Sequence, residues 1–300
     1  MKFKKKPTSL EEQVALLKSR GVEIDNDSAM QVLLLLNYYR FCGYGLYFEE
    51  LDNNGNRLDK FLPQTTFNRI YNLYLWDEKL RTLLQKYLGR FEIMFRSVLN
   101  YVMVTETQDP FWFLDDKLFT TSIDLINLRQ ECVDALERAI DNNELSAVHF
   151  KTTYAESDVP PCWILSEYLS FGKWSKIFGT FKFQSHVKMV AARLKAPPHD
   201  VVSWVRCLVI LRNRCAHHGR LWGYRFKIRP SRTPAMQRLH LGNDSVGALI
   251  FILHDLLSMD MSAQKEMTST FNELILACPE NFENALGLPK GFRFKKEMYR

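Results

Sequence analysis

The sequence lacks the features that mark several large classes of protein. Its longest apolar run, from Val246 to Leu253, has eight residues, whereas a membrane-spanning helix needs ~20. The basic start, from Met1 to Lys6, is followed by Pro7 instead of an apolar stretch, so it does not resemble a secretory signal. No internal repeat and no linker rich in Ser, Gly or Pro divides the 300 residues. We therefore expect a cytoplasmic protein with no membrane partner.

Cysteine is sparse, and no Cys-x-x-Cys pair is present. The six cysteines are Cys42, Cys132, Cys162, Cys207, Cys215 and Cys278. The four other than Cys42 and Cys278 lie in apolar, helix-like segments, which predicts that they are reduced residues of the core. The spacing does not fit a zinc site, so we expect neither a metal nor another cofactor.

One stretch of the chain has no acidic residue. Between Val201 and Asn243 there is no Asp or Glu but there are nine basic residues. They are Arg206, Arg212, Arg214, Arg220, Arg225, Lys227, Arg229, Arg232 and Arg238. The chain has 40 Lys and Arg against 34 Asp and Glu, a net charge of +6, so this stretch carries the whole positive excess. A local excess of this kind indicates an anionic partner.

Helical periodicity runs through nearly all of the chain. Ser9 and Glu12 form a capping box for a first helix that stops at Gly21. Thr66 opens a long helical stretch to about Thr105, which a break near Trp76-Asp77 could divide. Further helices are expected from Asp27 or Ser28 to Tyr39, over 122–140, from Pro160-Pro161 through Phe171, over 199–218 up to Gly219, and over 243–259 and 262–277.

Two segments do not fit a helix. Residues 43–62 resemble a loop with a turn at 53–56, and residues 224–232 a hairpin arm or loop. With no series of strands, the sequence predicts an all-α protein. We expect one domain over 1–300, with an N-terminal extension over about 1–62 and a helical core over about 63–280.

The helix expected from Val201 places an arginine within its apolar stripe. On a wheel of 100° per residue, Leu208 and Cys215 lie on the buried side with Arg212 between them. A buried, unpaired arginine is costly, so Arg212 must meet a carboxylate, a phosphate or a solvent-filled cleft. Glu167 is the natural carboxylate because it too is expected on an apolar face.

The same helix groups polar residues at its end. Asn213 and His217 form a row with Arg206 at the edge of the stripe, whereas Arg214 and His218 point towards solvent. Arginine can donate two parallel hydrogen bonds to a phosphate, and histidine titrates near neutrality. RNA brings its own nucleophile, the 2′-hydroxyl, so this set predicts metal-independent cleavage of a phosphodiester. One histidine cannot easily be both base and acid, which favours a two-fold dimer.

These residues resemble a known family. Arg212, Asn213 and His217 match the R-N-x3-H form of the HEPN motif. Residues 211–222 resemble the LRN-x-CAHH-x-RLW block of the bacterial Abi-like proteins, the AbiD/AbiF abortive-infection group. Three further blocks of that group have counterparts here: Tyr38 to Tyr44, then Arg90, Glu92 and Arg96, then Pro161 to Trp163 with Glu167 and Ser170 to Gly172.

The resemblance implies an α-helical HEPN-type bundle, usually dimeric, that acts as a metal-independent endoribonuclease. The group includes phage-defence proteins and toxins that cut RNA, and many HEPN toxins are restrained by an RNA or protein antitoxin. In this chain His217 would transfer the proton and Arg212 would bind the scissile phosphate. Asn213 would orient His217 or the phosphate. Glu167 would support Arg212, with Glu92 as a substitute.

The remaining basic residues would form the path of the RNA. Besides His218, which would support the site, they are Arg206, Arg214, Arg220, Arg225, Lys227, Arg229 and Arg232.

Two other functions stay open. A non-catalytic module could bind RNA by stacking bases on Trp222, Tyr224 and Phe226, and a protein-interaction domain could dock an acidic partner. For single residues there are also plainer interpretations. Arg212 could belong to a buried ion pair, and His217 could simply be favoured by the helix dipole.

Overall fold

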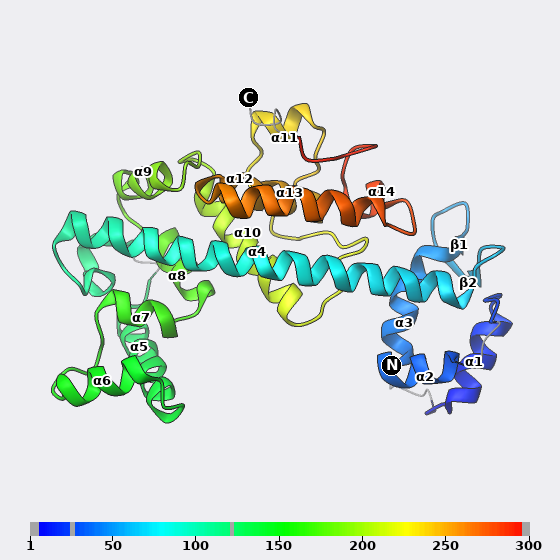
Figure 1. Cartoon of the computed structure of the whole chain (residues 1–300), viewed down its shortest axis with the longest axis horizontal. Helices are drawn as coiled ribbons and strands as arrows, with labels where there is room; N and C mark the ends of the chain where they lie inside the picture. The colour runs from blue at the N-terminus through cyan, green and yellow to red at the C-terminus, as the bar shows by residue number, and fades with distance from the viewer. Residues whose placement is uncertain (1–5, 25–27, 121–122, 296–300) are drawn as a thin grey trace.

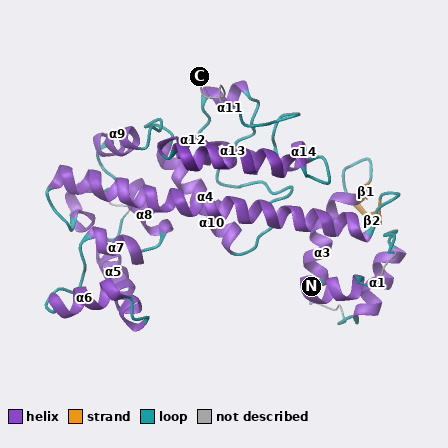
Figure 2. Cartoon of the chain, in the orientation of Figure 1, coloured by secondary structure: helices purple, strands orange, loops and turns teal. Residues whose placement is uncertain are grey.

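The computed structural model describes residues 6–24, 28–120 and 123–295. Within these residues helices dominate, and the one sheet is a two-stranded hairpin (Figure 2). The expectation of an all-α protein is therefore confirmed. The helices are α1 Leu10–Ser19, α2 Ala29–Leu36, α3 Tyr38–Gly45, α4 Phe67–Thr107, α5 Leu125–Asp141, α6 Leu145–Thr153, α7 Cys162–Tyr168, α8 Phe171–Gly179, α9 Gln184–Arg193, α10 Val201–Ala216, α11 Pro234–Arg238, α12 Val246–Leu256, α13 Met261–Leu276 and α14 Phe282–Leu286; the strands are β1 Glu49–Leu51 and β2 Arg57–Phe61.

The helix α4 runs along the longest axis of the molecule (Figure 1). It has 41 residues, which corresponds to about 61 Å. Thr66 caps its start, where the Thr66 hydroxyl accepts a hydrogen bond from the Arg69 amide at 3.1 Å. It ends at Gln108, which has a left-handed backbone. The break expected near Trp76-Asp77 is wrong, because the Asp77 side chain bonds to Tyr44, to Arg81 and to the loop after α10 and leaves the backbone hydrogen bonds of the helix intact.

The two ends of α4 carry different structures (Figure 1). The helices α1–α3 and the hairpin lie at its N-terminal end, and α5–α7 lie near its C-terminal end, while α12 and α13 lie alongside its length. The capping box of α1 is present, since Ser9 and Glu12 each accept a hydrogen bond from the backbone of the other. The salt bridge between Arg20 and Glu49, 2.5 Å long, ties the end of α1 to β1.

The loop expected over 43–62 is partly wrong. Helix α3 continues to Gly45, and β1 pairs with β2 in antiparallel register, with Glu49 opposite Phe61. The turn was placed correctly: the Asp52 carboxylate accepts hydrogen bonds from the Asn54 and Asn56 amides, both at 2.8 Å.

Several helices end earlier than the periodicity indicated. The second ends at Leu36, because Asn37 adopts a φ of 68° and starts a new helix. The helix after Pro161 divides into α7 and α8, since Ser170 is extended and caps α8. Asp27 and Ser122, at two expected helix starts, lie outside the described residues.

The core joins the helices around α10. This helix packs against α4, α8 and α12, and one cluster of buried apolar side chains extends from Leu17 to Phe294. All six cysteines are free, and the four expected in the core are buried. Among the described residues, no helix is long and apolar enough to cross a membrane.

Candidate functional site

Arg212 on α10 faces α4 and meets a carboxylate there. Its Nε lies 3.2 Å from Glu92 Oε2, in an alignment too poor for a hydrogen bond. Glu92 also pairs with Arg96, one turn further along α4, and Arg96 Nη1 donates a hydrogen bond to the Ser166 carbonyl at 2.9 Å. Burial lowers the pKa of both arginines. The Arg212 side chain is still 26% exposed, so its guanidinium can reach a ligand.

The expected partner, Glu167, does not hold Arg212. Glu167 is exposed at the surface of α7, and its charge acts on Arg96. The prediction was wrong because it continued one helix from Pro161 to Phe171. The break at Ser170 resets the helical phase, so the apolar face inferred for Glu167 does not exist. Glu92, the substitute, is the partner.

His217 and Asn213 are exposed at the end of α10, and Arg206 is exposed in the first half of the helix. The predicted row of polar residues is therefore present. Arg212 lies elsewhere on the helix, because five residues correspond to about 140° around the axis and about 7.5 Å along it. Arg212 contacts α4, whereas His217 lines a cavity against α3. Arg212 is not among the residues that line the cavity of His217.

The turn after α10 is built by His218 rather than by Gly219. His218 has a φ of 55°, and its carbonyl accepts a hydrogen bond from Arg40 Nη1 of α3 at 2.7 Å. The amide of Gly219 donates to the Arg214 carbonyl at 2.8 Å. A Cβ on Gly219 would lie 2.7 Å from Arg214 Cγ, so close approach, not a positive φ, requires glycine there.

Arg214 is not a free surface cation. Its Nε donates to the Arg220 carbonyl at 2.7 Å, and its Cζ lies 3.3 Å from the centre of the Tyr224 ring. Burial lowers its pKa. The expectation that Arg214 points towards solvent is wrong, because the loop after α10 folds back over it.

The same loop is anchored by Asp77, which is fully buried in α4. Its carboxylate accepts hydrogen bonds from the Tyr44 hydroxyl at 2.7 Å and from the amides of Leu221 and Trp222 at 3.2 and 2.9 Å. It also pairs with Arg81 one turn along α4. Asp77 thereby joins α3, α4 and the loop after α10 at one point.

The aromatic residues after α10 are mostly structural. Trp222 is 2% exposed and packs edge-on against Trp76 and Tyr47, and Phe226 is 3% exposed. Tyr224 is covered by Arg214. Trp222 and Phe226 are therefore too buried to stack on RNA bases, as the alternative of a non-catalytic module supposed.

The stretch without acidic residues, from Val201 to Asn243, has an acidic neighbour in the folded protein. Asp244 follows it directly and lies 4.0 Å from Arg225 and 3.9 Å from Arg229. Arg225 also donates to the Asn284 carbonyl at 2.8 Å. Lys227 and Arg232 are exposed, and Arg220 is partly exposed. The basic residues beyond α10 thus include a pair that is partly neutralised, Arg225 and Arg229, and others, Arg220, Lys227 and Arg232, that have no acidic partner within the part of the chain that the structure describes.

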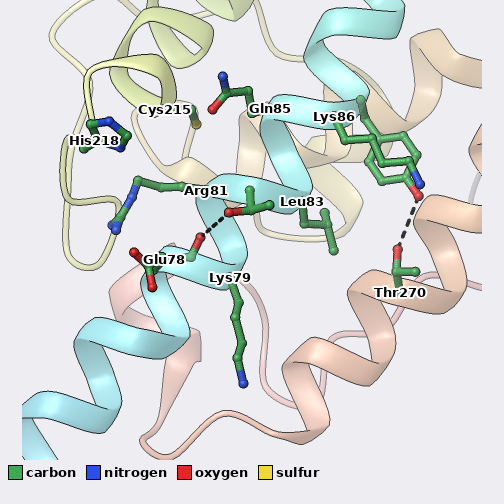
Figure 3. Close-up of a pocket in the computed structure, with 11 residues that line it drawn as sticks. Glu78, Lys79, Arg81, Leu83, Gln85, Lys86, Cys215, His218 and Thr270 are labelled. Carbon is green, nitrogen blue, oxygen red and sulfur yellow. Dashed lines mark hydrogen bonds between the residues drawn. The ribbon is translucent and has the colours of Figure 1, made fainter.

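Two cavities meet at His218. One, of about 490 Å³, lies between α3 and the end of α10 and is lined by Tyr39, Arg40, Gly43, His217, His218 and Arg220 among others. The other, of about 550 Å³, lies between α4, α13 and the loop after α10 (Figure 3). Glu78, Lys79 and Lys86 line the second, and Thr270 contributes from α13.

A family model for Abi-like proteins matches residues 31–223. The chain belongs to the Abi-like family. Membership of this family associates it with abortive infection, a defence of bacteria against phage. No curated protein and no solved structure matches the chain significantly.

The Abi-like match covers every residue described above from α3 to Trp222 and ends before Arg225. The blocks of the Abi-like pattern are brought into contact by the fold. Arg40 of the first reaches His218 of the last, and Glu92 of the second reaches Arg212. Asp77 lies outside these blocks, and only its place on the buried face of α4 could have indicated it. Within the described residues, no group of three His, Cys, Asp or Glu side chains could hold a metal ion.

Proposed function

We propose that this Abi-like protein is a metal-independent endoribonuclease of the HEPN type that acts in abortive infection. One observation carries the proposal. Glu92 fixes Arg212 but leaves 26% of its side chain exposed, at the helix whose end presents Asn213 and His217 to solvent. A positioned cation and an exposed base on one helix are the groups that cleavage of a phosphate diester needs, although one chain holds them apart.

The chemistry requires only groups of this chain and of RNA. The 2′-oxygen of the substrate attacks the adjacent phosphorus, a bond forms between them, and the bond to the 5′-oxygen breaks. His217 accepts the proton of the 2′-hydroxyl or donates one to the departing 5′-oxygen. Arg212 stabilises the negative charge that develops on the phosphoryl oxygens, and Asn213 orients the imidazole or the phosphate.

A two-fold dimer completes the site in this proposal. Arg212 and His217 contact different elements within one chain, and one histidine supplies either the base or the acid. Two copies of α10 facing each other would supply both roles. The whole chain acts as one domain, with residues 1–62 as an extension of the helical core.

The partners follow from this role. RNA would follow the exposed cations, Arg206, Lys227 and Arg232, and the partly exposed Arg220. Arg225 and Arg229 contribute less because Asp244 lies beside them. A nuclease that arrests growth needs restraint, and we propose an RNA or protein antitoxin as its source.

Cleavage of a labelled RNA by the purified protein tests the proposal. We expect wild type to cut equally with and without EDTA, and His217→Ala to lose about 10²- to 10⁴-fold in rate. His149→Ala is the matched control, because His149 is a histidine on α6, away from α10. Binding without cutting by wild type contradicts the nuclease, and loss of cutting in EDTA contradicts the metal-free chemistry.

Arg212→Ala separates a catalytic from a purely structural arginine. Glu92 keeps Arg96 as its partner, so the variant should remain folded by circular dichroism while it loses cleavage and growth arrest. Arg138→Ala, at an exposed position of α5, should change neither. If Arg212→Ala unfolds the protein, the ion pair with Glu92 is its whole role.

A further inference from the structure

The cavity between α3 and the end of α10 is lined by cations and aromatic rings, without a carboxylate. Arg40 and Tyr39 come from α3, and His217, His218 and Arg220 come from the end of α10 and the loop after it. The volume of about 490 Å³ is within the range of small-molecule sites. A site of this kind selects a ligand that is both anionic and aromatic.

The two arginines of this cavity keep donors free for a ligand. Arg40 uses Nη1 on the His218 carbonyl, which fixes the guanidinium and leaves its other nitrogens available. Arg220 extends over α3, because a Cβ on Gly43 would lie 3.9 Å from its Nη1. Within the described chain neither arginine has a carboxylate at ion-pair distance, although fifteen such pairs occur elsewhere.

Tyr39 supplies an unused aromatic face. It is 87% exposed, and it belongs to α3 directly beside Arg40. The Asn37 side chain caps α3 by accepting a hydrogen bond from the Tyr39 amide at 2.8 Å, which fixes the backbone from which the ring projects. An aromatic ring so exposed gains little from the fold, whereas it can stack on a planar base.

The neighbouring cavity provides the contrast. Figure 3 shows Glu78 among the residues of α4 that line it, together with Lys79 and Lys86. Lys86 is paired with Glu266. Mixed charge of this kind does not favour an anion, so the difference between the two cavities is one of charge, not of size.

We infer that the cavity between α3 and α10 binds one nucleotide unit, with the phosphate on Arg40 and Arg220 and the base on Tyr39. The unit can come from an RNA strand that passes His217, in which case the inference rests on the proposed function, or from a free mononucleotide. The N-terminal extension then shapes the site directly, since Tyr39 and Arg40 belong to it.

Binding of an RNA that cannot be cut tests this inference. The probe is a labelled, fully 2′-O-methylated RNA of about ten nucleotides, followed by fluorescence anisotropy at several salt concentrations. We expect Tyr39→Ala to weaken binding by about 5- to 150-fold, as for the loss of one stacked base. We expect Arg220→Gln to reduce the slope of log affinity against log salt by about 0.7, as for one phosphate contact on a single strand.

Lys79→Ala is the matched control, because Lys79 is exposed in the neighbouring cavity, and it should leave affinity unchanged. Tyr39 is so exposed that its truncation does not threaten the fold. The inference is overturned if Tyr39→Ala and Arg220→Gln both bind the probe as wild type does. Competition by AMP at equal nucleotide concentration assigns the cavity to a free nucleotide, and absence of competition, with the variant losses, assigns it to a strand.

The same measurements distinguish failure of the nucleotide-binding cavity from failure of the proposed nuclease. If wild type cuts no unmodified RNA but Tyr39-dependent binding persists, the nuclease fails and the nucleotide cavity stands. If wild type cuts RNA while Tyr39→Ala and Arg220→Gln bind and cut normally, the nuclease stands and the cavity is excluded.

Discussion

Asp77→Asn is expected to destabilise the protein strongly although it changes no apolar contact. Removing one partner of a buried ion pair costs about 3–5 kcal/mol, because Arg81 would keep an uncompensated charge. Arg81 is 4% exposed, so water cannot replace the carboxylate. The NH₂ group of the introduced asparagine would also face a donor such as the Trp222 amide, and an unsatisfied buried donor costs about 1–3 kcal/mol. We expect a total of about 4–6 kcal/mol, since the remaining oxygen still accepts from the other donors.

Chemical denaturation followed by tryptophan fluorescence measures this loss. Arg81→Met should cost less, because the Asp77 carboxylate keeps the Tyr44 hydroxyl and two amides. The double variant should cost less than the sum of the single ones, by about 1–3 kcal/mol. Asp158→Asn is the control: it removes an exposed pair with Arg129, worth about 0–1 kcal/mol. A loss below about 1 kcal/mol for Asp77→Asn, or strict additivity, refutes the reasoning.

Two further perturbations act on stability. Burial lowers the pKa of His254 to about 4 and raises that of Asp255 to about 6. Protonation of His254 therefore decreases the free energy of unfolding as the pH falls from about 6.5 to 4. Ionisation of Asp255 decreases it as the pH rises from about 4 to 6. Relative to wild type, His254→Gln should therefore gain stability towards pH 4 and Asp255→Asn should lose it, each by up to about 3 kcal/mol in denaturant titrations; parallel curves would contradict this. Gly247→Ala should destabilise, because its Cβ would lie 2.8 Å from the Leu286 carbonyl oxygen, whereas Gly89→Ala in α4 meets nothing within 4 Å and should stabilise by about 0.5–1 kcal/mol. Melting temperatures that move in the same direction for both glycine variants would exclude this explanation.

The helical architecture could be predicted from periodicity and caps, because these are local. Ser9 and Thr66 cap the helices that they were expected to open. Boundaries that depend on distant partners could not be predicted. Asp77 resembles a helix breaker in the sequence, but its side chain accepts hydrogen bonds from α3, from the loop after α10 and from Arg81 one turn along α4. The hairpin of 49–61 was missed because its strands are short and mostly exposed.

In the candidate site, too, local features could be predicted and those that depend on distant contacts could not. The wheel of α10 indicated a partner for Arg212, and a carboxylate was one of the three partners considered; it also placed His217 at an exposed edge, where it lies. The choice of Glu167 over Glu92 failed, because a break of two residues, Leu169 and Ser170, changes which face of α7 is buried. The role of Arg40 depends on the contact of α3 with the end of α10, 178 positions along the chain, and no local pattern encodes that distance.

The unbroken helix α4 has a consequence for how chains of this architecture can vary in length. Asp77 and Glu92 lie on the same helix, about 22 Å apart along its axis. The Asp77 side chain must point towards the loop after α10, and the Glu92 side chain must point towards Arg212. Loss of a single residue between them would turn one by about 100° relative to the other. Seven added residues would turn it by only about 20° but would separate the two by about 10 Å more. Insertions and deletions that a surface loop would tolerate are therefore excluded from this segment, because its length fixes the distance and the relative direction of Asp77 and Glu92.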